Sequence, residues 1–377
     1  YDPAKIAEVT LTEENRKCAR EVGKRSVVLL KNDGILPIRR EVTRILVTGA
    51  IAEDRQALLG PWAFTGSAEP VVTVVEGLRS YASEGVDVRY VRGFDVNDDR
   101  SDFAEAYEAA KQADLVIAVA GEREYMSGEA ASRANLHLAG AQEEFLSGLA
   151  KTGTPVAVVL INGRPLAIGC LKENPGIQAV LEAWHPGTEC GNVIAEILYG
   201  RYNPSGKLSV TFANEAGQEP MYYNHPNTGK PGSDFKFTSK YQDVPIAPLY
   251  PFGYGLSYTT FSYEDFRIEQ ETLTVEETLR CSVEVENTGA YAGEEIVQLY
   301  LRDVTASCAR PVKELKRFEK IFLAAGERAT VRFELPVSEM GFYNRSCDYV
   351  VEPGEFRLFV GTDSERVLEK TFQVVLQ

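Results

Sequence analysis

The chain changes its hydrophobic periodicity once, and this change divides it into two kinds of fold. Up to about residue 225, continuous apolar runs bounded by Gly or Asn alternate with amphipathic segments. The apolar runs include "RILVTGA" (44–50), "DLVIAVAGE" (114–122) and "TPVAVVLING" (154–163). Continuous apolar strands separated by helices predict a mainly parallel sheet with helices on both faces. The fold class expected here is therefore an α/β three-layer sandwich.

After about residue 255 the pattern alternates with a period of two, as in "RCSVEVEN" (280–287) and "GEFRLFVGT" (354–362). One face of each strand is then apolar, which predicts an antiparallel, all-β sandwich. The residues expected on the inner face are Cys281, Val283, Val285, Val331, Phe333, Leu335, Phe356, Leu358 and Val360.

These patterns predict an α/β domain over residues 1–225, a Pro- and Gly-rich connection over 226–260 and a β-domain over 261–377. In the first domain, Thr12 is the expected N-cap of a helix. Glu13 and Glu14 follow it, where the helix dipole favours negative charge.

Composition limits the partners that the chain can have. The formal net charge is −15, which argues against nucleic acid and anionic membrane surfaces and fits a neutral small molecule. No apolar run is long enough to span a bilayer. The six cysteines show no C-x-x-C spacing, and we expect free, mostly buried thiols. The three histidines are widely separated and no nucleotide-binding motif is present, so neither a metal nor a cofactor is expected.

The segment "VAGEREYMSGEAASR" (119–133) places three glutamates between two arginines, directly after an apolar strand. Ligands of parallel sheets bind at such strand ends, and hydrolytic acid/base chemistry uses carboxylates in different environments. The residues alone favour side chains that are solvated or paired with Arg123 for Glu122 and Glu124. They favour presentation by a turn for Glu129, because it follows Ser127-Gly128. Spacing alone leaves both catalysis and a solvated loop open.

Several long segments resemble, in order, the C-terminal part of a glycoside hydrolase family 3 enzyme of the periplasmic β-glucosidase type. These segments are "REVGKRSVVLLKNDGILPI" (20–38), "GEREYMSGEAASR" (121–133), "LINGRPLAI" (160–168), "GTECGNVIAEILYGRYNPSGKLSVTF" (187–212), "YPFGYGLSYTTF" (250–261) and "LYLRDVTASCARPVKELKRFEKI" (299–321). The resemblance covers essentially the whole chain.

The resemblance implies a (β/α)₈ barrel, then the α/β sandwich, then a fibronectin type III/immunoglobulin-like sandwich. The barrel is absent from this chain, and residues 1–12 resemble the linker that leaves it. The family is retaining: an aspartate of the barrel is the nucleophile, and a glutamate of the sandwich domain is the general acid/base. Glu129 matches that glutamate. We therefore expect a barrel of the same protein as partner and negligible activity without it; a homodimer is left open.

The resemblance also implies a β-glucoside or oligosaccharide substrate and contacts from Trp62 and Phe64 to the leaving-group sugar. Trp62 packing in the core or between domains is an equal alternative, and Trp184 and His185 are assigned to packing. Arg123 and Arg133 are expected to pair with Glu122, Glu124 or groups near the nucleophile.

Two alternatives remain: a β-xylosidase of the same family, and a non-catalytic module that binds carbohydrate or a partner. The family type implies a periplasmic or secreted protein, and the sequence leaves a cytoplasmic one open.

Overall fold

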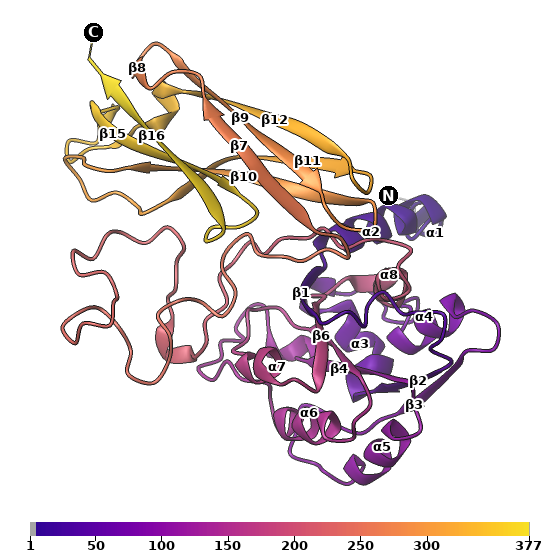
Figure 1. The fold of residues 1–377 in the computed structure, drawn as a ribbon. Coiled ribbons are helices and arrows are strands. Elements are labelled where there is room, and N and C mark those ends of the chain that lie inside the picture. The colour runs from indigo at the N-terminus through magenta and orange to yellow at the C-terminus, as the bar shows by residue number, and fades with distance from the viewer. Residues whose placement is uncertain (1–4, 377) are drawn as a thin grey trace. The chain divides into compact units, whose positions relative to one another are not determined.

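The computed structural model describes residues 5–376, so the first four residues of the expected linker and the last residue of the expected β-domain lie outside it. The chain separates into two units (Figure 1). The first runs to Gly206 and takes in residues 215–217, and the second comprises residues 207–214 and the chain from Gln218 onward.

The first unit is built on one mixed sheet with the strand order β1-β6-β5-β4-β2-β3. Strands β2 to β6 pair in parallel, and β1 is an antiparallel edge strand on β6. The bounds are β1 (Val28–Asn32), β2 (Arg44–Thr48), β3 (Asp87–Val91), β4 (Leu115–Gly121), β5 (Val156–Ile161) and β6 (Ile177–Glu182). Every residue of β4 and β5 is buried, as continuous apolar runs predict for central parallel strands.

Helices flank this sheet in two groups (Figure 1). Helix α8 contacts both α2 and α4, and α5 contacts α6. The helices are α1 (Ile6–Val9), α2 (Glu13–Ser26), α3 (Arg55–Leu59), α4 (Val74–Tyr81), α5 (Phe103–Ala110), α6 (Gln142–Ala150), α7 (Gly169–Glu173) and α8 (Cys190–Leu198). Single 3₁₀ turns are η2 (Ala50–Glu53), η3 (Pro61–Ala63), η4 (Glu124–Met126), η5 (Gly187–Glu189) and η6 (Ala216–Gln218). The expected α/β sandwich is confirmed.

Helix α2 begins where the sequence predicts. The Thr12 hydroxyl accepts a hydrogen bond of 3.2 Å from the Asn15 amide, and Glu13 and Glu14 lie in the first turn. The helix ends at Ser26, and the apolar run that follows it forms β1.

The second unit contains the expected all-β sandwich. One sheet has the order β11-β10-β15-β16-β8, and the other has the order β12-β9-β7. Pairing is antiparallel except between β8 and β16, which are parallel. The bounds are β7 (Phe261–Ile268), β8 (Thr272–Thr274), β9 (Thr278–Asn287), β10 (Gly293–Asp303), β11 (Glu314–Leu323), β12 (Arg328–Pro336), β15 (Gly354–Gly361) and β16 (Val367–Val375), with η7 (Val337–Met340) and the small hairpin β13 (Phe342–Tyr343) and β14 (Tyr349–Val350). All nine residues predicted for the inner face belong to the buried core.

Within residues 5–376, the six cysteines are free. The expectation that most of them are buried is wrong: only Cys190 and Cys281 are buried, whereas Cys18, Cys170 and Cys347 are exposed. Of the three exposed thiols, Cys18 lies within α2, Cys170 in α7 and Cys347 in the turn between β13 and β14. None of the helices in the described part of the chain is both long enough and apolar enough to cross a membrane.

Candidate active site

The ends of three neighbouring parallel strands bring polar residues to one edge of the first unit's sheet. Gly121 at the end of β4 is in register with Ile161 of β5, and Leu160 is in register with Glu182 of β6. Glu122 and Asn162 therefore follow adjacent strand ends, beside Glu182. The carboxyl edge of a parallel sheet is where ligands of such folds bind.

The loop after β4 is closed at its base by one side chain. The fully buried amide of Gln142 accepts a hydrogen bond of 2.9 Å from the Gly121 amide and donates one of 2.9 Å to the Gly121 carbonyl. It also donates to the Ala139 carbonyl at 2.9 Å. Both ends of the loop are thus fixed to the same residue at the start of α6.

A groove of about 510 Å³ opens at this edge, and Glu129 is exposed in it. Glu129 sits in a turn between Gly128, at φ 93°, and Ala130, at φ 57°. The left-handed backbone favours glycine at 128, where a Cβ would also lie 3.0 Å from the Pro61 Cβ. Ser127 lines the groove too, and its buried hydroxyl has no hydrogen-bond partner among the described residues.

Glu122 has the opposite environment: its side chain is fully buried between two guanidinium groups. Arg133 Nη1 lies 2.6 Å from Glu122 Oε1, and Arg164 Nε lies 3.1 Å from the same oxygen. Glu124 is half-buried in η4 and does not line the groove. Of the loop's three glutamates, Glu129 is therefore the one in contact with the groove.

Arg133 pairs with Glu122 as expected, whereas Arg123 pairs with neither Glu122 nor Glu124 among the described residues. Arg123 binds Asp95 through two nitrogens, at 3.1 and 2.8 Å, and it also pairs with Asp54. Burial opposes ionisation of Asp95, but hydrogen bonds from Arg123 and the Val96 amide lower its pKa. The sequence did not reveal this pairing because both aspartates come from the connections after β2 and β3. Neither arginine pairs with Glu129 in the described structure.

Trp62 lies in η3 and lines the same groove as Glu129. A Cβ on Gly128 would lie 3.7 Å from the Trp62 ring, so the indole borders the turn that carries Glu129. Its side chain is 62% exposed, which shows that Trp62 is not a core residue of this unit. Phe64 is 90% exposed at the end of η3, and it is not among the described residues that line the groove.

Glu182 is a second buried carboxyl beneath the site. Its Oε1 accepts from the Trp184 amide at 3.0 Å, and its Oε2 accepts from the Asn162 side chain at 3.1 Å. Burial raises the pKa of Glu182 to about 8. The two hydrogen bonds lower this pKa, whereas the nearby Glu122 charge raises it. Glu182 therefore keeps its proton to a higher pH than an ordinary glutamate does.

His185 lines the groove beside Glu129, and both of its ring nitrogens are buried, which agrees with the assignment to packing. Burial lowers its pKa, so the imidazole is neutral near pH 7. Gly163, in the loop after β5, also lines the groove, and a Cβ there would lie 2.5 Å from the Ser127 hydroxyl. Only a glycine allows this approach of the two loops.

Sequence reasoning missed Arg164 and Glu182, although both carry a usable signal. Arg164 follows the end of β5 and Glu182 ends β6, so both belong to the carboxyl edge at which parallel sheets place their ligands. A polar residue at the end of an otherwise apolar strand can be searched for in the sequence. Its burial cannot, because burial depends on which residues of other loops cover it.

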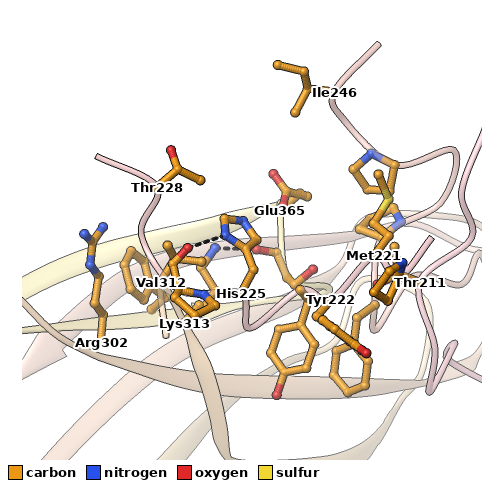
Figure 2. Close-up of a pocket in the computed structure, with 18 of the residues that line it drawn as sticks. Thr211, Met221, Tyr222, His225, Thr228, Ile246, Arg302, Val312, Lys313 and Glu365 are labelled. Atoms are coloured by element: carbon orange, nitrogen blue, oxygen red, sulfur yellow. Dashed lines mark hydrogen bonds between the residues drawn. The ribbon is translucent and has the colours of Figure 1, made fainter. Parts of the chain in front are cut away.

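The larger cavity, of about 690 Å³, lies in the second unit and is a different feature. Figure 2 shows Tyr222, His225, Lys313 and Glu365 around it. The Lys313 ammonium lies 4.8 Å from the centre of the Phe359 ring, and burial lowers its pKa. All residues that line this cavity come from the second unit, so Glu129 does not belong to it. No group of three or more His, Cys, Asp or Glu side chains among the described residues is arranged to hold a metal ion.

Comparison with known families and relatives gives the same picture of the chain. The profile of the glycosyl hydrolase family 3 C-terminal domain matches residues 27–258, and that of a fibronectin type III-like domain matches residues 295–364. The chain is 43% identical to a periplasmic beta-glucosidase of Salmonella typhimurium, over 96% of this chain and 50% of that protein. It is 37% identical to a beta-xylosidase of Formosa agariphila, over 100% of this chain and 52% of that protein.

A solved structure matches equally well. The beta-glucosidase from Listeria innocua in complex with gluconolactone is 40% identical and superposes with a TM-score of 0.91. The match covers 98% of this chain and 51% of that one. The chain thus spans about half the length of the relatives that it matches.

Proposed function

The chain belongs to glycosyl hydrolase family 3, and from this membership we propose that it is the C-terminal portion of a retaining β-glucosidase. In this proposal Glu129 is the general acid/base, and Trp62, with Phe64 as a weaker candidate, contacts the leaving-group sugar. The observation that carries the proposal is the contrast within one loop: Glu129 is exposed in the groove, whereas Glu122 is buried and ion-paired.

The proposed reaction needs two proton transfers at one carboxyl group. When the bond between the anomeric carbon and the glycosidic oxygen breaks, the Glu129 carboxyl gives its proton to that oxygen. The resulting carboxylate then takes a proton from the water that adds to the anomeric carbon and releases the sugar from the nucleophile. An exposed carboxyl in an open groove can reach both the leaving oxygen and the incoming water.

The nucleophile in this proposal belongs to a (β/α)₈ barrel of the same protein, outside this chain. The two carboxyl groups of a retaining site stand about 5 to 5.5 Å apart, so the barrel must approach Glu129 closely. Trp62 and Phe64, 62% and 90% exposed, give this edge an apolar surface that docking would cover. Tyr125, 65% exposed, lies on the same loop as Glu129.

The substrate proposed is a terminal β-glucosyl residue of an oligosaccharide, as the names of the Salmonella and Listeria relatives suggest. A β-xyloside is the second candidate, because the Formosa relative is named a beta-xylosidase. The sugar that is cleaved contacts mainly the barrel, so comparing the two activities in the natural protein decides between them. By analogy with the Salmonella relative, we propose a periplasmic location.

The test is the Glu129→Ala variant of the natural protein that contains this chain. Hydrolysis of disaccharides, whose leaving group needs a proton, should fall by about 10²- to 10⁴-fold, and activated aryl glycosides should lose much less. Added azide should restore part of the turnover and yield a β-glycosyl azide. Disaccharide hydrolysis within a few-fold of wild type would contradict the role of Glu129 and favour a non-catalytic module.

A further inference from the structure

We propose that Glu122 is a positioning residue: it holds two guanidinium groups that fix the backbone around Glu129. This inference rests on the proton-transfer role of Glu129 proposed above. It assigns a task to the fully buried carboxylate of the loop, which that role leaves unused.

Arg164 connects Glu122 to both sides of the Glu129 turn. Its Nε lies 3.1 Å from one Glu122 oxygen and 3.2 Å from the other. Its Nη2 donates to the Met126 carbonyl and, at 2.7 Å, to the Ala131 carbonyl. One carbonyl precedes Glu129 and the other follows it. Because a guanidinium is planar and rigid, holding it in place also fixes the two carbonyls relative to each other.

Arg133 fixes the far end of the same segment. Its Nη1 lies 2.6 Å from Glu122, and its Nη2 donates to the His137 carbonyl at 3.0 Å. Glu122 itself is anchored to the sheet, because its amide donates to the Ile161 carbonyl at 2.7 Å. A chain of contacts therefore runs from β5 through Glu122 and the two arginines to the loop.

The turn has little regular structure of its own. Residues 127–133 form no helix or strand, and the backbone hydrogen bond that spans Glu129, from the Ala131 amide to the Gly128 carbonyl, is long at 3.4 Å. The arginine contacts thus link this turn to the rigid sheet. A displacement of about 1 Å at a reacting group can cost about 10²-fold in rate, so the position of Glu129 depends on them.

The substitution that tests this role is Glu122→Gln, which keeps the shape and removes the charge. An amide offers one acceptor oxygen and turns two N–H donors toward guanidinium groups that are donors themselves. Both arginines then lose part of their anchoring in a buried environment.

The chain offers a matched control in Glu189, which ends η5. Its side chain is also fully buried between two arginines, with Arg16 at 2.6 Å and Arg20 at 2.8 Å. Those arginines belong to α2, and in the described structure their hydrogen bonds and ion pairs go to Pro70, Tyr81, Glu189 and Glu196 rather than to the Glu129 loop. Glu189→Gln therefore removes an equivalent buried charge and leaves the proposed positioning contacts intact.

The experiment compares Glu122→Gln, Glu189→Gln and Glu129→Ala in the natural protein that contains this chain, with kcat and KM for a disaccharide and for an activated aryl glycoside. We expect Glu122→Gln to lower kcat for the disaccharide at least about tenfold more than for the aryl glycoside, with KM nearly unchanged. Glu189→Gln should affect both substrates equally. If Glu129→Ala discriminates between the substrates and Glu122→Gln behaves like Glu189→Gln, the positioning role is wrong. If Glu129→Ala also slows both substrates equally, the proposed acid/base role of Glu129 is itself wrong.

Hydrogen exchange of the chain itself, measured by mass spectrometry, tests the positioning role of Glu122 without an activity assay. Peptides covering residues 123–133 should exchange at least about tenfold faster in Glu122→Gln than in wild type or Glu189→Gln, because opening of this segment becomes easier. Arg164→Lys should give the same local effect, since a lysine cannot bridge the same groups. Unchanged exchange of this segment in a folded Glu122→Gln or Arg164→Lys chain overturns the proposal.

Discussion

Glu122 and Glu129 belong to one loop but differ completely in environment, since Glu122 is buried between Arg133 and Arg164 and Glu129 is exposed in the groove. The first carboxylate has its charge compensated by fixed donors, and the second is available to a ligand. Two identical side chains thus have different environments, and the backbone turns at Ser127 and Gly128 between them.

We predict that the 377-residue chain alone hydrolyses aryl β-glucosides at a negligible rate. The described residues place no second carboxylate opposite Glu129 in its groove, and a retaining mechanism needs one. Enzyme assays on a sample whose mass shows only these residues measure this, with the natural protein that contains the chain as the positive control. Turnover by the chain alone at the level of that control would mean that its own residues suffice.

We predict that Trp62→Ala weakens the leaving-group side of the site. Because the exposed indole borders the Glu129 turn, its loss should raise KM for disaccharides about 3- to 10-fold. Substrates with a small leaving group should be affected little. Tyr125→Ala is the control, since Tyr125 is equally exposed but does not line the groove. Equal effects of the two variants would indicate a loss of domain docking instead.

We predict that Gly163→Ala disturbs the Glu129 loop through Ser127. The added Cβ would lie 2.5 Å from the Ser127 Oγ and 2.8 Å from its Cβ, so one loop must move. Overpacking of this kind costs about 1–3 kcal/mol in unfolding free energy, and urea denaturation measures it. The double variant Gly163→Ala/Ser127→Gly should recover most of the loss. If the single variant is as stable as wild type, the close approach is not rigid.

We predict that Glu182 makes the first unit less stable as the pH rises. Unfolded, this carboxyl loses its proton near pH 4.5; folded, it keeps the proton until about pH 8. The contribution of Glu182 to the free energy of unfolding is fully present below pH 4.5 and is lost as the pH rises through 8. The total loss is on the order of 5 kcal/mol. Glu182→Gln should remove this dependence of the unfolding free energy on pH.

Urea denaturation at pH 5 to 9 tests the Glu182 prediction, because the fluorescence of Trp62 and Trp184 reports on the first unit alone. The control is Glu84→Gln, an exposed position where this dependence on pH should stay as in wild type. If the unfolding free energy of Glu182→Gln changes with pH as it does in wild type, Glu182 is ionised in the folded chain.

The periodicity of the sequence predicted both folds because it records which side chains must be buried. The alternation in "RCSVEVEN" placed Cys281, Val283 and Val285 in the core, and all three are there. The antiparallel direction of β1 was not predictable, since a short apolar run after a helix carries no information on pairing. The direction of β1 depends on which strand edge is free once the other strands have assembled.

The candidate site was only partly predictable for a similar reason. Of the partners expected for Arg133, which were Glu122, Glu124 and groups near the nucleophile, the structure has Glu122, which lies on the same loop. Arg123 pairs with Asp54 and Asp95, which come from the connections after β2 and β3, and no local pattern reveals that. The burial of Glu122 depends likewise on Arg164, which comes from the loop after β5.

The closure of the loop by Gln142 has a consequence for how such proteins can diversify. Because one amide holds Gly121 and Ala139 together, the segment that leaves β4 and leads to α6 has its two ends fixed relative to each other. Insertions, deletions or a transplanted loop between those points need not alter the spacing of β4 and α6. Evolution or protein engineering can therefore exchange this part of the candidate active site while β4 and α6 keep their positions.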